Sequence, residues 1–318
     1  MTTREQCAAL GWETDLDFTV ERVIACNESA LIFDVVGLAA LGERPTAVKV
    51  RRIDDAAVKL MRRHLPPETP VGLWYPDSLE GLERLDANHV VLTSAASLDP
   101  RALARLGPSV RTLSIYGPAF PPGSVAASSM PYVGELTLPW GLLSVDDALP
   151  PGLRSLRFED DTPPTLSAIP RSSHLEILEL SPARELATLD GLDRFPSLRT
   201  LEIAGAALHD IGGLALAPNL TVLGFEACRR LPELGPVGQL RQLRQLALLD
   251  CGDIPSIVPL AGHPSIAELV AYGTTRIADG DLSPLLSMPA LRRLVLASRR
   301  SYTPSVAEVR RRAGLVGE

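Results

Sequence analysis

A short hydrophobic frame recurs along this chain at a nearly constant interval, and it constrains the fold more than any other feature. The frame L-x-x-L-x-L, with other aliphatic residues allowed at the Leu positions, fits "LEILEL" at 175–180, "LRTLEI" at 198–203 and "LRQLAL" at 243–248. The second aliphatic residue of successive copies lies at positions 90, 113, 136, 156, 178, 201, 223, 246, 269 and 294. This register, kept over ten copies, predicts one structural unit repeated in series.

The residues of each copy indicate how the unit folds. Alternating aliphatics form a short strand with one face turned inward, and connecting halves such as "LHDIGGLALAPNL" supply further aliphatics. One unit cannot bury its own inner face, but stacked units can. The pattern resembles the leucine-rich repeat family over residues 87–298, most nearly the short class found in internalins. The resemblance implies an α/β solenoid with a parallel sheet on the concave face and short helical or irregular turns on the convex face.

Two of the four cysteines fall at one position of the repeat. Cys228 and Cys251 follow the frame where the leucine-rich repeat motif continues with Asn or Cys. The resemblance implies that a small polar side chain there bonds to backbone in the neighbouring coil, so we expect two rungs of a ladder and not a metal or redox pair. Other copies differ at this position, so we expect an irregular ladder. They carry Ala206, Asp161, Thr274, Gly141 and Pro118.

The two ends of the chain do not fit the repeat. In residues 1–86, "FTVERVIAC", "ALIFDVV" and "TAVKV" predict three strands and "DDAAVKLMRRHL" predicts a helix, which together make a small α+β cap or accessory domain. Residues 299–318 predict a capping helix, with Thr303 or Ser305 as its N-cap and Glu308 completing a capping box. Such caps would cover the open ends of a stack of repeats.

The order of elements in residues 1–86 also resembles the small lobe of protein kinases. Lys49 in "AVKV" stands where that family has its phosphate-pairing lysine. The turn "CNESA" lacks the glycines of a phosphate loop, and no H-R-D or D-F-G sequence follows. Phosphoryl transfer would therefore lack its base and its metal ligands. A nucleotide-binding or degenerate kinase-like domain, with the repeats capturing substrate, is the alternative function.

The composition and the absence of known catalytic motifs reduce the number of possible functions. The formal net charge of -7 disfavours nucleic-acid binding. The most apolar stretch, "ALIFDVVGLAAL", is interrupted by Asp34 and is too short to span a membrane. The first residues lack a signal-peptide pattern, so we expect a cytoplasmic protein with reduced thiols. No phosphate loop, H-E-x-x-H or G-x-S-x-G sequence occurs, so we expect no catalysis, metal or cofactor.

Residues between the aliphatics should point away from the core and be free to meet a partner. The middle repeats carry acidic residues there, and Glu179 and Glu202 should lie about 5 Å apart on adjacent strands. We expect Arg157 to relieve part of their repulsion, and Arg154 and Arg199 to relieve more. The later repeats expose apolar residues, among them Val222 and Val295. The candidate partner-binding residues are Glu159, Asp160, Glu179, Glu202, Glu226, Leu249, Val270 and Tyr272.

These features favour a non-catalytic scaffold that holds one protein partner on the concave face. An acidic area beside an apolar one suits a partner with a basic rim and an apolar anchor. Regulation of an enzyme and neutralisation of a toxin as an immunity protein are specific versions. A self-associating adaptor is a third possibility that the sequence leaves open.

Overall fold

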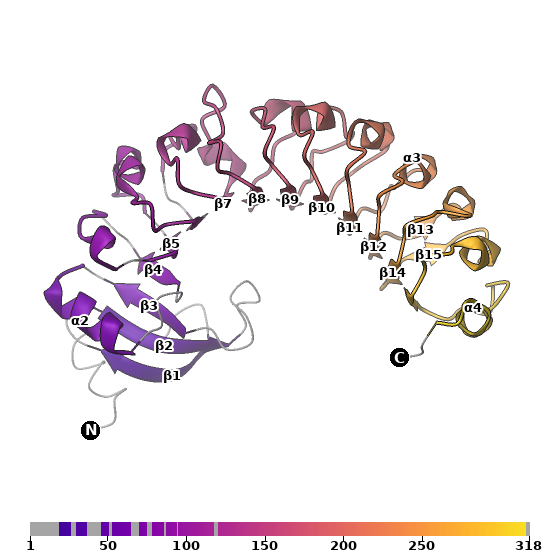
Figure 1. Cartoon of the computed structure of the whole chain (residues 1–318), viewed down its shortest axis with the longest axis horizontal. Helices are drawn as coiled ribbons and strands as arrows, with labels where there is room; N and C mark the ends of the chain where they lie inside the picture. The colour runs from indigo at the N-terminus through magenta and orange to yellow at the C-terminus, as the bar shows by residue number, and fades with distance from the viewer. Residues whose placement is uncertain are drawn as a thin grey trace. The chain divides into compact units, whose positions relative to one another are not determined.

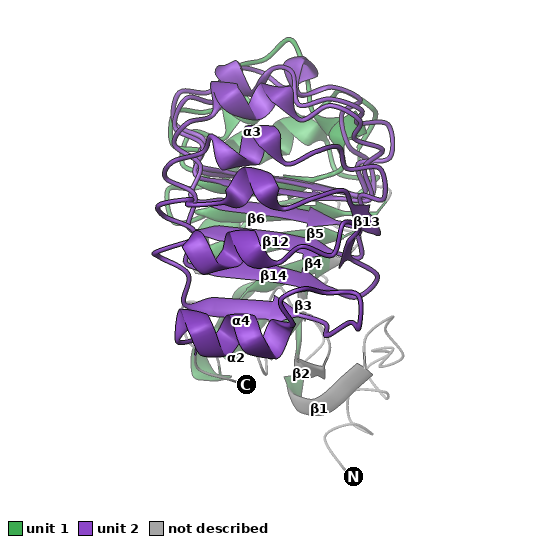
Figure 2. Ribbon diagram, turned by 90° about the vertical axis from the view of Figure 1, so that its right-hand side faces the viewer, with its two compact units in different colours: residues 1–153 green, residues 154–318 purple. Residues whose placement is uncertain are grey.

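The computed structural model describes residues 19–26, 30–36, 46–50, 53–64, 70–74, 78–85, 87–93, 95–117 and 120–315. The chain divides into two compact units, residues 1–153 and 154–318, which Figure 2 shows in different colours. Within each unit, strands that follow one another in the sequence pair side by side, as β5 (His89–Thr93) does with β6 (Thr112–Tyr116) and β10 (Thr200–Ala204) with β11 (Val222–Glu226).

Unit 1 begins with an antiparallel sheet that becomes parallel. Strand β1 pairs antiparallel with β2, and β2 with β3, whereas each later strand pairs parallel with the one before it. The expected strands and helix of residues 1–86 are confirmed. The elements are β1 (Thr19–Cys26), β2 (Ala30–Val36), β3 (Thr46–Val50), α2 (Asp55–His64), β4 (Val71–Trp74), η2 (Leu82–Leu85), β5 (His89–Thr93), η3 (Pro100–Arg105), β6 (Thr112–Tyr116), η4 (Ala127–Ser129), β7 (Glu135–Leu138) and η5 (Trp140–Leu142).

Strand β4 is a member of the parallel ladder that the repeat frame did not predict. Val71 pairs with Val90 of β5, so β4 lies one strand before the first predicted copy. The sequence "VGLW" has Gly72 between its aliphatics and lacks the first Leu of the frame, which explains why the spacing missed it. The proposed boundaries at 86/87 and 298/299 stay predictions.

Unit 2 is a regular parallel stack. Its strands lie on one side of the coils and its short helical turns on the other, as Figure 1 shows. The strands are β8 (Ser155–Glu159), β9 (Ile177–Ser181), β10 (Thr200–Ala204), β11 (Val222–Glu226), β12 (Gln245–Leu249), β14 (Glu268–Tyr272) and β16 (Arg293–Leu296). The turns are η6 (Leu166–Ala168), η7 (Leu192–Arg194), η8 (Gly212–Leu216), α3 (Gly235–Gly238), η9 (Val258–Leu260) and η10 (Ser283–Ser287). A second sheet pairs β13 (Asp253–Ile254) with β15 (Arg276–Ile277).

The predicted register of unit 2 is confirmed. The second aliphatics of successive copies are backbone partners on neighbouring strands and are at most 4% exposed. They are Leu156, Leu178, Leu201, Leu223, Leu246, Leu269 and Leu294. Residues on either side of each point the other way, giving an alternation of buried and half-exposed positions. Since burial of one such side chain contributes about 1.5–3 kcal/mol, this leucine row stabilises the stack.

A ladder of small polar side chains runs beside the leucine row. The Cys228 thiol donates to the carbonyl of Ile203 at 3.5 Å, one coil back, and the Cys251 thiol donates to the carbonyl of Phe225 at 3.3 Å. Both contacts confirm the predicted structural role of the two cysteines. In the next coil the sequence places Thr274 at the ladder position, and this prediction is wrong.

Thr275 takes that place in the ladder. Its hydroxyl donates to the carbonyl of Leu248 at 2.8 Å and accepts the backbone N–H of Cys251 at 2.9 Å. Thr275 lies three residues after the end of β14, whereas Cys228 and Cys251 each lie two residues after the end of their strands, so this turn holds one residue more. Thr274 is left exposed, and its N–H bonds to Asp250.

A capping helix follows the last strand of unit 2, as predicted. Helix α4 spans Val306–Ala313, and its N-cap is Ser305, whose hydroxyl accepts the N–H of Glu308 at 3.2 Å. Arg310 donates from its guanidinium to the carbonyl of Leu294 on β16 at 3.0 Å. The cap is therefore bonded to the backbone of the terminal strand.

The expectation that all four thiols are reduced is wrong for one of them. Cys26, at the end of β1, is disulfide-bonded, whereas Cys228 and Cys251 are free and buried. Disulfides persist mainly in oxidising compartments. This bond therefore opposes the argument from thiols for a cytoplasmic location, which stays a prediction.

Candidate functional site

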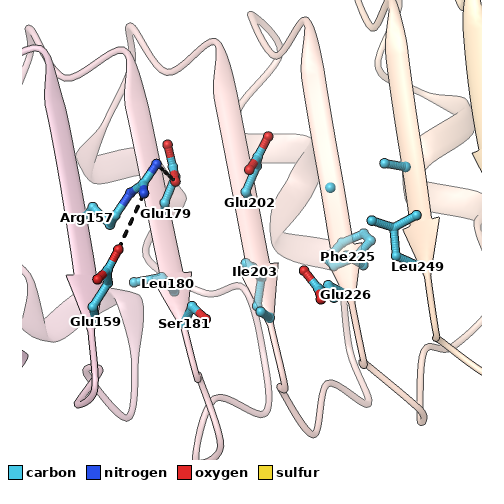
Figure 3. A pocket seen from close by; sticks show the side chains of 13 residues that line it. Arg157, Glu159, Glu179, Leu180, Ser181, Glu202, Ile203, Phe225, Glu226 and Leu249 are labelled. Atoms are coloured by element: carbon cyan, nitrogen blue, oxygen red, sulfur yellow. Dashed lines mark hydrogen bonds and ion pairs between the residues drawn. The ribbon is translucent and has the colours of Figure 1, made fainter. Parts of the chain in front are cut away.

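A hollow of about 290 Å³ opens over the outward-facing side chains of β8–β12 in unit 2 (Figure 3). We call it the acidic hollow. Its charged lining is Arg157, Glu159, Glu179, Glu202 and Glu226. These side chains reach it because strand residues alternate between two faces, and the leucine row takes the buried face.

Two of the carboxylates stand side by side at the centre of the acidic hollow. Glu179 and Glu202 are backbone partners on β9 and β10, as the repeat register predicted. The partner of Glu202 on β11 is Gly224. A Cβ atom at Gly224 would lie 3.3 Å from Cγ of Glu202, so the missing side chain gives Glu202 room on that side.

A single arginine supplies the opposite charge within the acidic hollow. The Arg157 guanidinium pairs with Glu179 and, at 3.4 Å, with Glu159 (Figure 3). These contacts confirm the expected relief of repulsion by Arg157. Among the ion pairs of the described residues, none includes Glu202 or Glu226.

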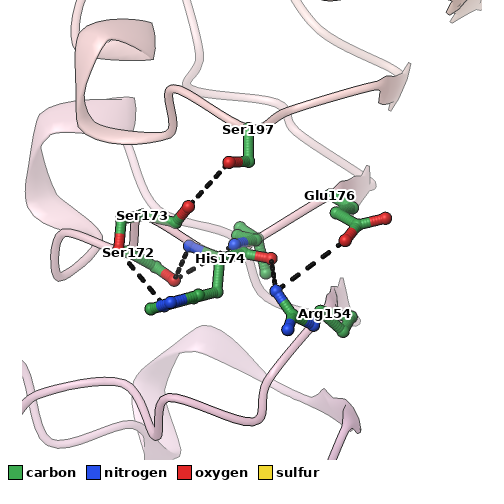
Figure 4. Close-up of polar contacts among 7 residues, drawn as sticks. Arg154, Ser172, Ser173, His174, Glu176 and Ser197 are labelled. Atoms are coloured by element: carbon green, nitrogen blue, oxygen red, sulfur yellow. Dashed lines mark hydrogen bonds and ion pairs between the residues drawn. The ribbon is translucent and has the colours of Figure 1, made fainter.

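Arg154 does not contribute to this relief, contrary to expectation. It lies before β8 and pairs with Glu176 at 3.8 Å, while its guanidinium donates to the carbonyl of His174 at 3.1 Å (Figure 4). Both partners belong to the chain just before β9, at the edge where the strands begin. Arg154 is therefore held at this edge and away from the acidic hollow.

Burial and, after it, nearby like charge shift the pKa of Glu202. Burial by the neighbouring strands raises the pKa of the Glu202 carboxyl, and the charges of Glu179 and Glu226 raise it further. Arg157 opposes the rise. Glu202 is thus the carboxylate with most to gain from a cation brought in by a partner.

The predicted apolar residues lie beside the acidic hollow, but only Tyr272 is widely exposed. Leu249 lines the hollow, and it is the backbone partner of both Glu226 and Tyr272 on the adjoining strands. Tyr272 is 63% exposed, whereas Leu249 and Val270 are half-buried. Val222 and Val295 are half-buried as well. The acidic and apolar areas are therefore continuous along one edge of the strand face.

Asp160 is the one predicted acidic site residue that does not line the acidic hollow, and the apolar residues Val270 and Tyr272 do not line it either. Asp160 follows β8 in a turn, with φ of 66°, and it is exposed. Its separation from the other carboxylates follows from this left-handed turn, which ends the alternation of the strand. Ser181 and Ala204 also line the hollow and were not among the predicted binding residues, because their short side chains carry no charge.

The buried thiols are poorly suited to nucleophilic chemistry. Burial raises the pKa of the Cys251 thiol to about 12 and also raises that of Cys228. Thiolate is the reactive form of cysteine, so both side chains are held in the unreactive state at neutral pH. Over the described ranges, no group of three or more His, Cys, Asp or Glu side chains is placed to hold a metal ion.

A serine–histidine contact near β9 also has a structural explanation. The Ser173 hydroxyl lies 3.1 Å from Nδ1 of His174, and both residues are exposed (Figure 4). The carbonyl of Ser173 accepts a hydrogen bond from the Ser197 hydroxyl at 2.7 Å, which joins two successive coils. Asn219 repeats this bond one coil later, to the carbonyl of Pro196 at 3.0 Å. The cluster is thus part of a second polar ladder.

Two other expectations concern nucleotide binding through Lys49 and membrane-spanning helices. The Lys49 side chain lies outside the described side chains, so the nucleotide-binding alternative stays a prediction. In the part of the chain that the structure describes, no helix has the length and apolar character needed to cross a membrane.

Comparison with known proteins identifies the fold. No protein-family model and no curated protein matches the chain. Among solved structures, internalin C2 from Listeria monocytogenes is 20% identical, with a TM-score of 0.36, over 54% of this chain and 64% of its own. A leucine-rich repeat protein from Leptospira interrogans is 16% identical, with a TM-score of 0.41, over 78% and 76%.

The Toll–Spatzle complex of Drosophila contains a chain that is 16% identical, with a TM-score of 0.53, over 93% of this chain and 43% of that one. The protein described here thus spans less than two thirds of the length of internalin C2, and less than two thirds of the matched chain in the Toll–Spatzle complex. At sequence identities this low, the comparison supports the fold and says nothing about activity. With its confirmed leucine register and its thiol ladder, the chain has the fold of leucine-rich repeat proteins.

Proposed function

We propose that this chain is a non-catalytic scaffold that binds a protein partner through the strand face of unit 2. The acidic hollow is the observation that carries the proposal, because it gathers carboxylates around one arginine and leaves Glu202 and Glu226 without ion pairs among the described residues. A native protein gains nothing in stability from such crowding. A cationic partner would turn the same arrangement into a favourable one.

The partner has a basic rim and an apolar anchor. A lysine or arginine entering the acidic hollow would meet Glu202, whose raised pKa falls once a cation is bound. Tyr272 lies beside the hollow with most of its ring exposed, and tyrosine is a frequent anchor at protein interfaces. Charge complementarity of this kind sets specificity and association rate more than affinity.

The chemistry of the site supports binding better than catalysis. The free thiols are buried with raised pKa values, and the Ser173–His174 contact belongs to a structural ladder. The printed name of the Toll–Spatzle complex shows that another protein of this fold takes part in a protein complex. Regulation of an enzyme and neutralisation of a toxin are the two specific versions of the proposal.

Affinity capture from the native cell with the full chain as bait, followed by mass spectrometry, identifies the partner. Binding of that partner is then measured for the variants Glu179→Lys/Glu202→Lys and Tyr272→Ala. Each is expected to weaken binding by about tenfold or more, because both surfaces lie at the centre of the contact.

The matched control is Glu185→Lys/Glu233→Lys, which makes the same change in net charge on exposed turns. It should bind the partner as the parent does. If the strand-face variants fold normally and capture the same proteins with the same affinity, the proposal is wrong.

A further inference from the structure

A second hollow, of about 730 Å³, lies at the edge of unit 2 where the strands begin. We call it the arginine groove. Arg199, Arg241 and Arg244 line it together with short or uncharged side chains such as Ser265 and Ala267, and no carboxylate takes part in its lining. Its charge is opposite to that of the acidic hollow and to the net charge of -7 of the whole chain.

The three arginines of this groove are not engaged by the protein itself. Two other exposed arginines of unit 2 do have a carboxylate partner: Arg171 pairs with Asp193 at 3.0 Å, and Arg276 pairs with Asp253. Over the described ranges, no ion pair or side-chain hydrogen bond involves the guanidinium groups of Arg199, Arg241 or Arg244. All three are exposed. Their charge is therefore available to a ligand.

The repeat register fixes the distance between two of these arginines. Arg199 directly precedes β10 and Arg244 directly precedes β12, so they occupy equivalent positions two strands apart. With neighbouring strands about 4.8 Å apart, their backbones are roughly 10 Å apart. The intervening equivalent, Thr221, is short, and so is Ala267 on the far side. Two long cationic side chains thus lie beside positions with short side chains, which leaves space for a ligand between and next to them.

A protein segment rich in carboxylates fits this arrangement best. Guanidinium groups bind carboxylates in a two-pronged geometry that lysine cannot reproduce. In an extended segment, side chains two residues apart point the same way and lie about 7 Å apart, within reach of two flexible arginines. Single-stranded nucleic acid fits less well, because the lining contains no aromatic side chain on which bases could stack.

We propose that the arginine groove binds an acidic, extended segment of a protein partner through Arg199, Arg241 and Arg244. This site is separate from the acidic hollow and does not depend on the function proposed for it. A partner that carries both a basic and an acidic stretch could occupy the two sites together.

The test uses a fluorescein-labelled oligoglutamate peptide and the full chain at low ionic strength, with binding read by fluorescence anisotropy. Arg199→Ala/Arg244→Ala is expected to weaken binding by about tenfold or more, since two charge-assisted contacts are lost. Ala267→Glu, which places a carboxylate in the groove while keeping all three arginines, is expected to weaken it to a similar degree. Arg184→Ala/Arg229→Ala, on exposed turns, is the control with equal charge change and should bind as the parent does.

Circular dichroism confirms that each variant is folded before binding is compared. The proposal is overturned if the parent does not bind the peptide, or if the groove variants bind it as well as the turn control does. It is also overturned if a single-stranded DNA oligonucleotide of equal charge binds more tightly than the peptide and loses its affinity in the same variants.

Discussion

Glu179 and Glu202 are backbone partners on adjacent parallel strands, and Arg157 pairs with Glu179 but not with Glu202. Two carboxylates in this position repel each other, and one guanidinium cannot neutralise both. Burial by the neighbouring strands raises the pKa of the Glu202 carboxyl, and the charge of Glu179 raises it further. This charge imbalance leaves unit 2 less stable than its leucine row alone would make it.

Replacement of Glu202 by Gln should therefore stabilise unit 2. The expected gain is roughly 0.2–1 kcal/mol at pH 7, because a like-charge pair across two strands is removed. A carboxyl whose pKa is raised on folding costs stability only above its unfolded value, 4.5, so the gain should shrink as the pH falls towards that value. Denaturant titrations at pH 7 and pH 4.5 measure the difference, with Glu185→Gln on an exposed turn as control. An equal gain at both pH values would contradict the electrostatic explanation.

The third rung of the ladder distinguishes two adjacent threonines. Thr275→Val should cost about 1–3 kcal/mol, because it leaves the buried N–H of Cys251 without this partner and removes the hydroxyl bond to the carbonyl of Leu248. Thr274→Val changes an exposed side chain and should cost less than about 0.5 kcal/mol. Thermal unfolding of the two variants under identical conditions gives the comparison. Equal losses would show that Thr275 is not a rung.

A buried histidine should make unit 2 sensitive to acid. Nδ1 of His263 accepts the N–H groups of Ser265 and Ile266, at 3.3 and 3.2 Å, and Nε2 lies 3.0 Å from the carbonyl of Leu240. Only the neutral ring with its proton on Nε2 satisfies all three contacts. Burial lowers the pKa of His263, the Leu240 carbonyl raises it, and Arg241 lowers it.

The lowered pKa of His263 sets the direction of the pH effect. The unfolded chain takes up the proton first, near pH 6.5, so the stability contributed by His263 is complete above that pH and is lost as the pH falls below it. Unfolding free energies between pH 8 and pH 5 should fall more steeply for the parent than for His263→Gln. His209→Gln, on an exposed turn, should keep the slope of the parent. Parallel curves for all three proteins would refute this account.

Two glycines of α3 test how closely the turns of neighbouring coils approach. A Cβ atom at Gly238 would lie 2.2 Å from the carbonyl oxygen of Pro259, whereas one at Gly235 would meet nothing within 4 Å. Gly238→Ala should therefore cost about 1–3 kcal/mol, because the backbone of the next coil must move. Gly235→Ala should leave stability within about 0.5 kcal/mol of the parent. Chemical denaturation separates them, and a neutral Gly238→Ala would mean that the coils are looser than they appear.

The sequence predicted the fold where a single physical cause dominates. The leucine spacing determined the register of Glu179 opposite Glu202, because side chains alternate along a strand and a shift by one residue would bury the wrong face. The resemblance to leucine-rich repeats, placed on this register, implied that Cys228 and Cys251 are rungs, and their bonds confirm it. It missed Thr275 because the turn after β14 holds one residue more than the turns that lead to Cys228 and Cys251, which the leucine spacing does not reveal.

Features that depend on pairing between side chains were harder to predict. Arg154 was expected to help Glu179 and Glu202, but Glu176 and the carbonyl of His174 are nearer partners. The arginine groove was missed although it has a sequence signal, since Arg199 and Arg244 each follow the first Leu of their copies, "LRTLEI" and "LRQLAL". Arg154 and Arg292 stand at the same position in their own copies, so position alone does not show which arginines remain unpaired.

The hydrogen bond from Arg310 to the carbonyl of Leu294 bears on self-association of the protein. A terminal strand with vacant carbonyls is a template on which a second chain can extend the sheet. By holding α4 against β16, this guanidinium blocks part of that template. Truncation of the chain before residue 305 should thus leave a protein that polymerises end to end, visible as growing light scattering at concentrations where the full chain stays clear.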